Sequence, residues 1–321
     1  MGGTISAHGK NRLDLKDYTS GRYKGNDFFE AIPELREIAE VEFETFLSVS
    51  STAITASHWI QLREKVTACL LEEDFDGVVI THGTNTLEET AYFLHLTIPT
   101  SKPIVFVGAQ RPFTALSSDA QLNLVQAVRV AANDASYGKG VLVVLNDEIS
   151  SAREVTKTNT YRLETFQSGQ LGFLGFIDPD QEVHFYRKPT KKHTIHSTFA
   201  TTSFSQLPNV EIIYSYAGST GNVIEHIIQT KKYAGIVVAG TGAGLVSPSE
   251  IQALKEATQA GLFVVRSSRV GNGRVVPIDL YKQYSFISGD NLLPQKARIL
   301  LMLSLVKYKH FEDIQQVFHT H

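Results

Sequence analysis

Three short segments of the sequence combine glycine and threonine in patterns that could support nucleophilic chemistry. They are Gly2-Gly3-Thr4-Ile5-Ser6, Thr81-His82-Gly83-Thr84-Asn85-Thr86 and Thr156-Lys157-Thr158. A threonine hydroxyl is a weak nucleophile near neutral pH, so it needs a partner that takes its proton. The lysine of the third segment is a candidate for that partner, provided that it lies close to a threonine hydroxyl.

Each segment also has a plainer structural interpretation. Paired glycines are typical of a tight turn, although they also let backbone N–H groups approach a ligand closely. Thr86 and Glu89 have the spacing of a helix capping box, which would account for one threonine and leave Thr84 and Asn85 unexplained. A lone lysine such as Lys157 is most often a solvated surface group.

Several other kinds of site are excluded by the sequence. It contains no G-x-S-x-G elbow, no H-E-x-x-H motif and no Walker A lysine motif. The single cysteine, Cys69, excludes an intrachain disulfide and a cysteine-rich zinc site. The 30 lysine and arginine residues nearly balance the 33 aspartate and glutamate residues, which argues against a nucleic-acid partner. We therefore expect no cofactor, no metal, no nucleic acid and no membrane partner.

The candidate residues need a scaffold, and the hydrophobic pattern predicts one. Short apolar runs typical of strands buried on both faces occur at 77–80, 104–107, 141–145, 212–214, 236–238 and 263–265. Stretches with helical spacing occur at 59–71, 87–96, 118–132, 249–261 and 294–306. This alternation predicts a doubly wound α/β fold, in which ligands bind at the carboxyl ends of the strands. The segment that contains Thr84 follows such a strand.

A length of 321 residues suggests about two domains. Residues 187–207 are rich in Lys, Thr, Ser, His and Pro, which predicts a linker between an N-terminal domain at 1–186 and a C-terminal domain at 208–321. A hairpin is expected over 176–186. Within the linker, the H-x-x-H pair of His193 and His196 is expected to be solvated rather than metal-binding.

Taken together, the three segments resemble those of the bacterial L-asparaginase family. Further similarity lies in Val107-Gly-Ala-Gln-Arg-Pro112, Val265-Arg-Ser-Ser-Arg-Val270 and Pro294-Gln-Lys-Ala-Arg298. The similarity extends in order over nearly the whole chain and is strongest to the type II, often periplasmic, branch. It implies a two-domain asparaginase-like α/β fold, with a larger N-terminal parallel-sheet domain and a smaller C-terminal α/β domain.

The resemblance also implies an activity and an assembly. Members of the family hydrolyse a side-chain amide to a carboxylate and ammonia without a cofactor. By resemblance, this chain acts on a small-molecule amide as a homotetramer of intimate dimers in the periplasm. The segment Met1-Gly2-Gly3-Thr4-Ile5 has no signal-peptide character, so a cytoplasmic location stays open.

The resemblance assigns roles to particular residues. Thr4 matches the nucleophile, and Tyr18 matches the tyrosine of a mobile loop that closes over the site, here roughly residues 6–25. Thr84 and Lys157 match a second threonine and its lysine, which manage protons. Backbone N–H groups of the Gly3 and Thr84 turns would hold the developing oxyanion. The substrate-binding positions implied by the match are Gly3, Ser51, Thr52, Gly83, Asn85 and Ala109.

Four positions depart from the family pattern. Asn85 replaces an aspartate and Thr52 a glutamine, while Ala243 and Ile278 fall where an asparagine and an acidic residue are usual. The family groups at these positions contact the α-ammonium of the substrate. Because a charge-assisted hydrogen bond contributes roughly 1.5–3 kcal/mol, loss of the aspartate alone would weaken binding of free asparagine about ten- to a hundredfold.

Three functions are consistent with these departures. The first is an amidohydrolase of L-asparagine. The second is an asparaginase specialised for N-substituted asparagine, such as fructose-asparagine or an opine. The third is a non-catalytic asparaginase-like binding protein, although the presence of both threonines and the lysine argues against it.

The start of the chain also differs from the family pattern. In the family a strand, often preceded by a signal peptide, leads into the Gly-Gly-Thr segment. This sequence begins at Met1-Gly2-Gly3. The resemblance therefore implies a natural chain that is longer at its N terminus by a strand and a leader.

Overall fold

The structure is a computed structural model that describes residues 1–321. The chain divides into two compact units, an N-terminal unit (Met1–Ser203) and a C-terminal unit (Phe204–His321). The division falls within residues 187–207, and the domain boundaries at 186 and 208 stay a prediction. No helix of either unit is both long enough and apolar enough to cross a bilayer.

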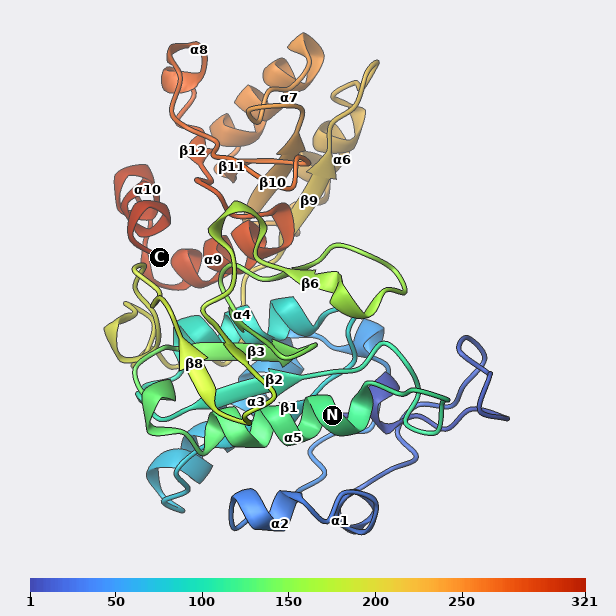
Figure 1. Ribbon diagram of the computed structural model, residues 1–321. Helices are drawn as coiled ribbons and strands as arrows, with labels where there is room; N and C mark the ends of the chain where they lie inside the picture. The colour runs from blue at the N-terminus through green and yellow to red at the C-terminus, as the bar shows by residue number, and fades with distance from the viewer. The chain divides into compact units, whose positions relative to one another are not determined.

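The N-terminal unit is built on a six-stranded sheet with the order β1-β2-β3-β4-β7-β8 (Figure 1). The strands are β1 (Val78–Thr81), β2 (Ile104–Val107), β3 (Val141–Leu145), β4 (Glu148–Ser151), β7 (Gly175–Ile177) and β8 (Val183–Phe185). β1, β2 and β3 are parallel, whereas β4, β7 and β8 extend the sheet in antiparallel pairs. The predicted α/β class is correct, and the sheet is mixed rather than wholly parallel.

The change of direction follows from the turn between β3 and β4. Asn146 and Asp147 both adopt positive φ angles, 54° and 60°. Two such residues form the tight turn that joins antiparallel neighbours, whereas parallel neighbours need a long crossover. The hairpin predicted over 176–186 corresponds to β7 and β8.

Helices provide the crossovers between the parallel strands. The helices of this unit are α1 (Asn26–Ala31), α2 (Leu35–Ile38), α3 (Ala56–Leu71), α4 (Leu87–Thr97) and α5 (Ala120–Ala131). On one face of the sheet, Val105 and Val107 of β2 pack in one core with Leu124 and Ala127 of α5, the helix that runs alongside these strands in Figure 1. The carboxyl ends of β1 and β2 are thereby fixed before the turns that follow them.

The C-terminal unit has a four-stranded, wholly parallel sheet with the order β12-β11-β10-β9. The strands are β9 (Val210–Tyr214), β10 (Gly235–Gly240), β11 (Phe263–Ser268) and β12 (Ile287–Ser288). The helices are α6 (Asn222–Thr230), α7 (Pro248–Gln259), α8 (Asp279–Lys282), α9 (Pro294–Lys307) and α10 (Phe311–Thr320). Ile224 of α6 and Leu254 of α7 share a core with Val238 and Val264 of the sheet.

The prediction that His193 is solvated is wrong. His193 is only 6% exposed, and its ring centroid lies 4.9 Å from that of His95 in α4. Its Nδ1 is 2.9 Å from the Thr194 hydroxyl oxygen, so a polar side chain can be buried here with a local partner. His196 is exposed, as predicted.

Burial of His193 predicts that the protein loses stability in mild acid. Burial, together with the charge of His196, lowers the pKa of His193 to about 4. An unfolded histidine titrates near pH 6.5, so only the unfolded state gains this proton between pH 6.5 and 4. The free energy of unfolding should therefore fall by about 2–3 kcal/mol from this group as the pH drops through that window.

Urea unfolding at pH 7.5 and pH 4.5 tests this expectation. His193→Gln should show a smaller loss of stability between the two pH values than the wild type, whereas the exposed control His226→Gln should show the same loss as the wild type. An equal loss in wild type and His193→Gln would contradict the assignment.

Candidate active site

Gly3 and Gly83 lie against each other, and their contact brings two of the threonine segments together. Gly3 has φ +87°, and a Cβ atom built on it would lie 2.3 Å from Gly83 Cα. Because the atoms opposite Gly3 are backbone, this position has no room for a side chain unless the backbone shifts. The turn before Thr4 can therefore approach the turn between β1 and α4, which contains Thr84.

Tyr18 lies next to Thr4, with the phenol oxygen 2.9 Å from Thr4 Oγ1. The loop that contains Tyr18 is closed by a pair of backbone hydrogen bonds between His8 and Thr19, at 3.0 and 3.1 Å. Near its end, Gly21 N–H donates to Ser6 Oγ at 3.2 Å. These contacts hold the loop against the segment that follows Thr4, which explains how residues 14 positions apart meet.

A second hydroxyl pair lies at the end of β1. Lys157 Nζ donates a hydrogen bond to Thr84 Oγ1 at 2.8 Å. Lys157 lies in β5 (Thr156–Lys157), which pairs with β6 (Phe166–Gln167). Burial lowers the pKa of Lys157, and the structure pairs its amine with no carboxylate. A lowered pKa increases the fraction of neutral amine, which is the form that can accept a proton.

Ser51 is held at the same turn by Thr86. The Thr86 hydroxyl donates to the Ser51 carbonyl oxygen at 2.7 Å, and a Cβ atom on Gly83 would lie 2.7 Å from Ser51 Oγ. Ser51 is 4% exposed. The capping-box prediction for Thr86 is wrong, because this hydroxyl makes no cap hydrogen bond to α4 and is used to hold Ser51 instead.

The remaining predicted contacts differ in exposure. Ala109 is fully buried after β2, and a Cβ atom on the preceding Gly108 would lie 3.0 Å from Thr84 Cγ2. Thr52 and Asn85 are exposed, each directly beside a buried site residue in the sequence. The Thr52 hydroxyl lies 2.8 Å from that of Ser50, whereas the Asn85 side chain makes no hydrogen bond.

Sequence reasoning missed Asp119, which holds the loop that contains Ala109. The Asp119 carboxylate accepts the backbone N–H groups of Gln110 and Arg111, both at 2.9 Å. It also accepts a bond from Asn123, whose amide donates to the Gly108 carbonyl oxygen at 3.0 Å. The available signal was an acidic residue in the first turn of a predicted helix, but its partners are set by the tertiary fold.

His82 is a second residue that sequence reasoning left unassigned. It is 1% exposed, and its Nδ1 lies 2.8 Å from the Gly83 carbonyl oxygen. Burial lowers the pKa of His82 to about 4, so the ring is neutral at pH 7. A neutral ring that bonds the Gly83 carbonyl is suited to hold the turn before Thr84 and unsuited to add charge there. No group of three or more His, Cys, Asp and Glu side chains is placed to hold a metal ion.

Two α/β units, one of which contains a threonine–tyrosine pair and a threonine–lysine pair, define an amidohydrolase of the asparaginase type. Comparison with known proteins agrees: residues 1–191 match the family model "Asparaginase, N-terminal", and residues 209–318 match "Glutaminase/Asparaginase C-terminal domain". The chain belongs to the asparaginase family.

Individual relatives cover nearly the whole chain. L-asparaginase 2 of Bacillus subtilis (strain 168) is 41% identical over 320 residues, which cover 100% of this chain and 84% of the relative. A probable periplasmic L-asparaginase of Haemophilus influenzae is also 41% identical, over 99% of this chain and 90% of the relative. The crystal structure of a probable cytoplasmic L-asparaginase from Campylobacter jejuni has a TM-score of 0.96 and 41% identity, and the match covers 100% of this chain and 98% of that chain. The predicted family, fold and enzyme class are confirmed.

Proposed function

We propose that this protein hydrolyses the side-chain amide of L-asparagine to L-aspartate and ammonia, with Thr4 as the nucleophile. The observation that supports this most directly is the pair of short hydroxyl contacts, Thr4 to Tyr18 at 2.9 Å and Thr84 to Lys157 at 2.8 Å. Each hydroxyl has a partner able to hold or relay a proton, which is what an activated threonine requires.

In the proposed mechanism, Thr4 Oγ1 attacks the amide carbon and its proton is relayed through Tyr18 toward the leaving nitrogen. The carbonyl oxygen becomes an oxyanion, which backbone N–H groups of the Gly3 and Thr84 turns stabilise. Ammonia leaves and an acyl ester remains on Thr4. A water molecule then attacks this ester, and one of its protons passes through Thr84 to the neutral Lys157 amine. The ester bond to Thr4 breaks, the other proton of the water passes to Thr4 Oγ1, and aspartate is released.

The substrate is held by residues around the same turns. Ser51, which Thr86 fixes beside Gly83, binds the α-carboxylate. The backbone of Gly3 and Gly83 and the buried wall at Ala109 surround the amide group. Thr52 and Asn85 contact the α-amino end, and their exposure is consistent with an opening on that side of the substrate.

Ammonia release from purified protein tests the proposal. Incubation with L-asparagine, L-glutamine and fructose-asparagine should give ammonia from at least L-asparagine. If none of the three gives ammonia although the protein binds asparagine, the chain is a binding protein and not an enzyme.

A second candidate substrate is asparagine with a substituent on its α-nitrogen. This alternative is favoured by two exposed residues. Asn85 is uncharged where the family has an aspartate, and Thr52 is smaller than the glutamine that the family has there. An α-ammonium would meet no carboxylate at position 85, whereas a substituted nitrogen needs none. Equal turnover of asparagine and fructose-asparagine would argue against such a specialisation.

The variant Asn85→Asp tests which substrate the site prefers. The added carboxylate should lower KM for free asparagine by about tenfold or more, because it supplies a charge-assisted hydrogen bond to the α-ammonium. KM for fructose-asparagine should rise. Asn222→Asp, which adds the same charge at an exposed asparagine of the C-terminal unit, should change neither value. Unchanged KM values in Asn85→Asp would show that this position does not select the substrate.

We also propose a homotetramer of intimate dimers that acts in the periplasm. Family membership supports the tetramer, and the periplasmic name of the Haemophilus influenzae relative supports the compartment. Sedimentation velocity should give four times the chain mass of 35.5 kDa, and osmotic shock of expressing cells should release the enzyme. A monomeric mass, or activity retained in the spheroplasts, would overturn the corresponding part.

A further inference from the structure

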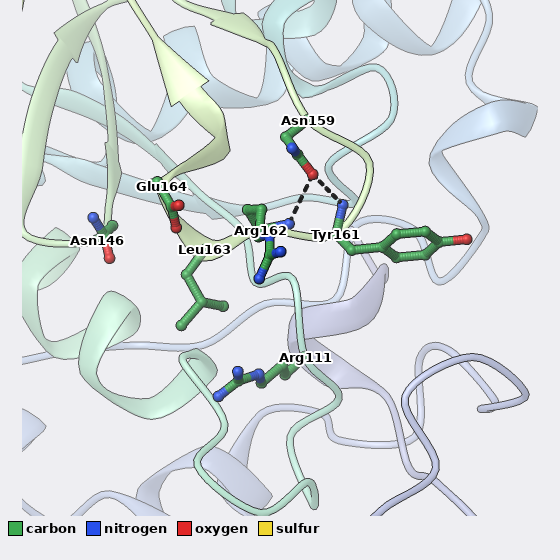
Figure 2. A pocket seen from close by; sticks show the side chains of 7 residues that line it. All are labelled: Arg111, Asn146, Asn159, Tyr161, Arg162, Leu163 and Glu164. Carbon is green, nitrogen blue, oxygen red and sulfur yellow. Dashed lines mark hydrogen bonds between the residues drawn. The ribbon is translucent and has the colours of Figure 1, made fainter.

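A cavity of about 510 Å³ lies in the N-terminal unit and is formed by residues that the proposed mechanism does not use. Figure 2 shows its lining, which consists of Arg111, Asn146, Asn159, Tyr161, Arg162, Leu163 and Glu164. The volume is within the range of small-molecule sites, about 300–1,000 Å³. Most of the lining side chains are polar or charged, so the cavity is suited to a polar ligand.

Two arginines line this cavity with most of their hydrogen-bonding capacity unused. The Arg162 guanidinium makes no hydrogen bond and no ion pair. Arg111 uses Nη1 to bond the Ser117 carbonyl oxygen at 2.7 Å, and its other nitrogens remain available. A guanidinium group matches the geometry of a carboxylate and binds it through two parallel hydrogen bonds. The two groups could therefore bind two carboxylates.

Carboxyl groups lie on and next to another part of the same wall. Glu164 lines the cavity, and Glu148 stands at the start of β4 beside the lining residue Asn146. Burial, against an opposing hydrogen bond with Asn146 and together with the charges of Asp147 and Glu164, raises the pKa of Glu148 to about 7. The Glu164 carboxylate is exposed at this wall and attracts a cation, so the cavity offers sites for both signs of charge.

The backbone around both arginines is held in place. Asn159 Oδ1 accepts the N–H groups of Tyr161 and Arg162, at 2.9 and 3.1 Å (Figure 2). On the other side, the Asp119 carboxylate accepts the Arg111 N–H. Arginines whose loops are fixed lose less conformational entropy on binding than arginines on free surface loops.

The cavity is also joined along the chain to the candidate active site. Arg111 follows Ala109 by two residues, and Asn159 follows Lys157 by two residues. The two loops that line the cavity therefore follow directly, along the chain, on segments of the proposed catalytic cluster.

We propose that this cavity is a second binding site, for a small amino acid with two carboxylates. Arg111 and Arg162 bind the carboxylates, and Glu164 binds the ammonium group. L-Aspartate, the product of asparagine hydrolysis under the proposed function, is one compound of this class. The site itself rests on the charges and the volume of the cavity.

Isothermal titration calorimetry of the full chain with L-aspartate tests this second site. Arg162→Ala should show one binding event fewer per chain than the wild type. Arg36→Ala, an exposed arginine of α2 outside the cavity, should show the wild-type number. The same number of events in Arg162→Ala and wild type would overturn the proposal.

Succinate tests the ammonium contact, because it has both carboxylates and no amino group. It should bind the Arg162-dependent site at least about tenfold more weakly than L-aspartate, and Glu164→Gln should remove that difference. Equal binding of succinate and L-aspartate by the wild type would overturn the assignment to an amino acid. The binding readout is independent of ammonia release, so failure of the proposed enzyme activity would be seen separately.

Discussion

Replacement of Thr4 by alanine is expected to lower kcat for asparagine hydrolysis by about 10³-fold or more, which corresponds to roughly 4 kcal/mol of transition-state stabilisation. The variant lacks the oxygen that attacks the amide, and the Tyr18 phenol loses its partner at 2.9 Å. Affinity for asparagine should change little, because Ser51 and the glycine turns remain. Ammonia release by a coupled assay gives kcat, and calorimetry of the inactive variant gives Kd.

Two further variants make the Thr4 result specific. Thr4→Ser keeps a hydroxyl and should retain far more activity than Thr4→Ala. Thr201→Ala changes an exposed threonine of the same unit that makes no side-chain hydrogen bond, and it should have wild-type kcat. If Thr4→Ala kept more than about a tenth of the wild-type kcat, the nucleophile would be another group.

Two strands of the N-terminal sheet could be predicted from the sequence because both of their faces are buried. β2 and β3 are completely buried, so an unbroken apolar run identifies them. β4, by contrast, has the sequence Glu148-Ile-Ser-Ser151 and is formed because the Asn146-Asp147 turn brings it beside β3. Its pairing depends on that turn and on the neighbouring strand, and its own composition does not indicate a strand.

Two of the helices that the sequence pattern did not predict, α6 and α10, were missed for a related reason. α6 (Asn222–Thr230) contains one valine and three isoleucines, residues that favour strands, and only the spacing of Ile224 and Ile227 on the buried face marks it as a helix. α10 (Phe311–Thr320) buries only three side chains. In both cases packing of one apolar face against the rest of the unit decides the conformation, and local propensity does not.

The chemical identity of the candidate site was visible in the sequence, but its geometry was not. The family resemblance brought Thr4, Tyr18, Thr84 and Lys157 into one hypothesis. The structure adds two hydroxyl contacts and the close approach of Gly3 to Gly83. Together these contacts join three segments that are far apart in the chain. The roles of Asp119 and Thr86 likewise depend on partners that the tertiary fold brings to them, which is why a local capping rule gave the wrong partner for Thr86.

Replacement of Lys157 by methionine is expected to lower kcat by about 10²–10³-fold, the usual contribution of a positioned proton acceptor. Methionine has a similar length but cannot accept the proton that Thr84 relays. Burial lowers the pKa of Lys157, so the buried cation disfavours the folded state, and the uncharged variant should unfold at a Tm no lower than that of the wild type. The loss of activity would then be separable from loss of structure. Lys192→Met, at an exposed lysine, is the matched control and should leave kcat unchanged.

The pH dependence of kcat distinguishes a proton acceptor from a lysine that only positions Thr84. An acceptor must be neutral, so wild-type kcat should rise with pH as Lys157 loses its proton. The lowered pKa places this rise below the ordinary range of a lysine. Lys157→Arg can still donate a hydrogen bond to Thr84 but stays protonated, so it should be as inactive as Lys157→Met. A purely positioning role would predict the opposite result for Lys157→Arg, because an arginine reproduces the charge and the donor at the Thr84 hydroxyl. This variant would then keep substantial activity, and its kcat would depend on pH as the wild-type kcat does.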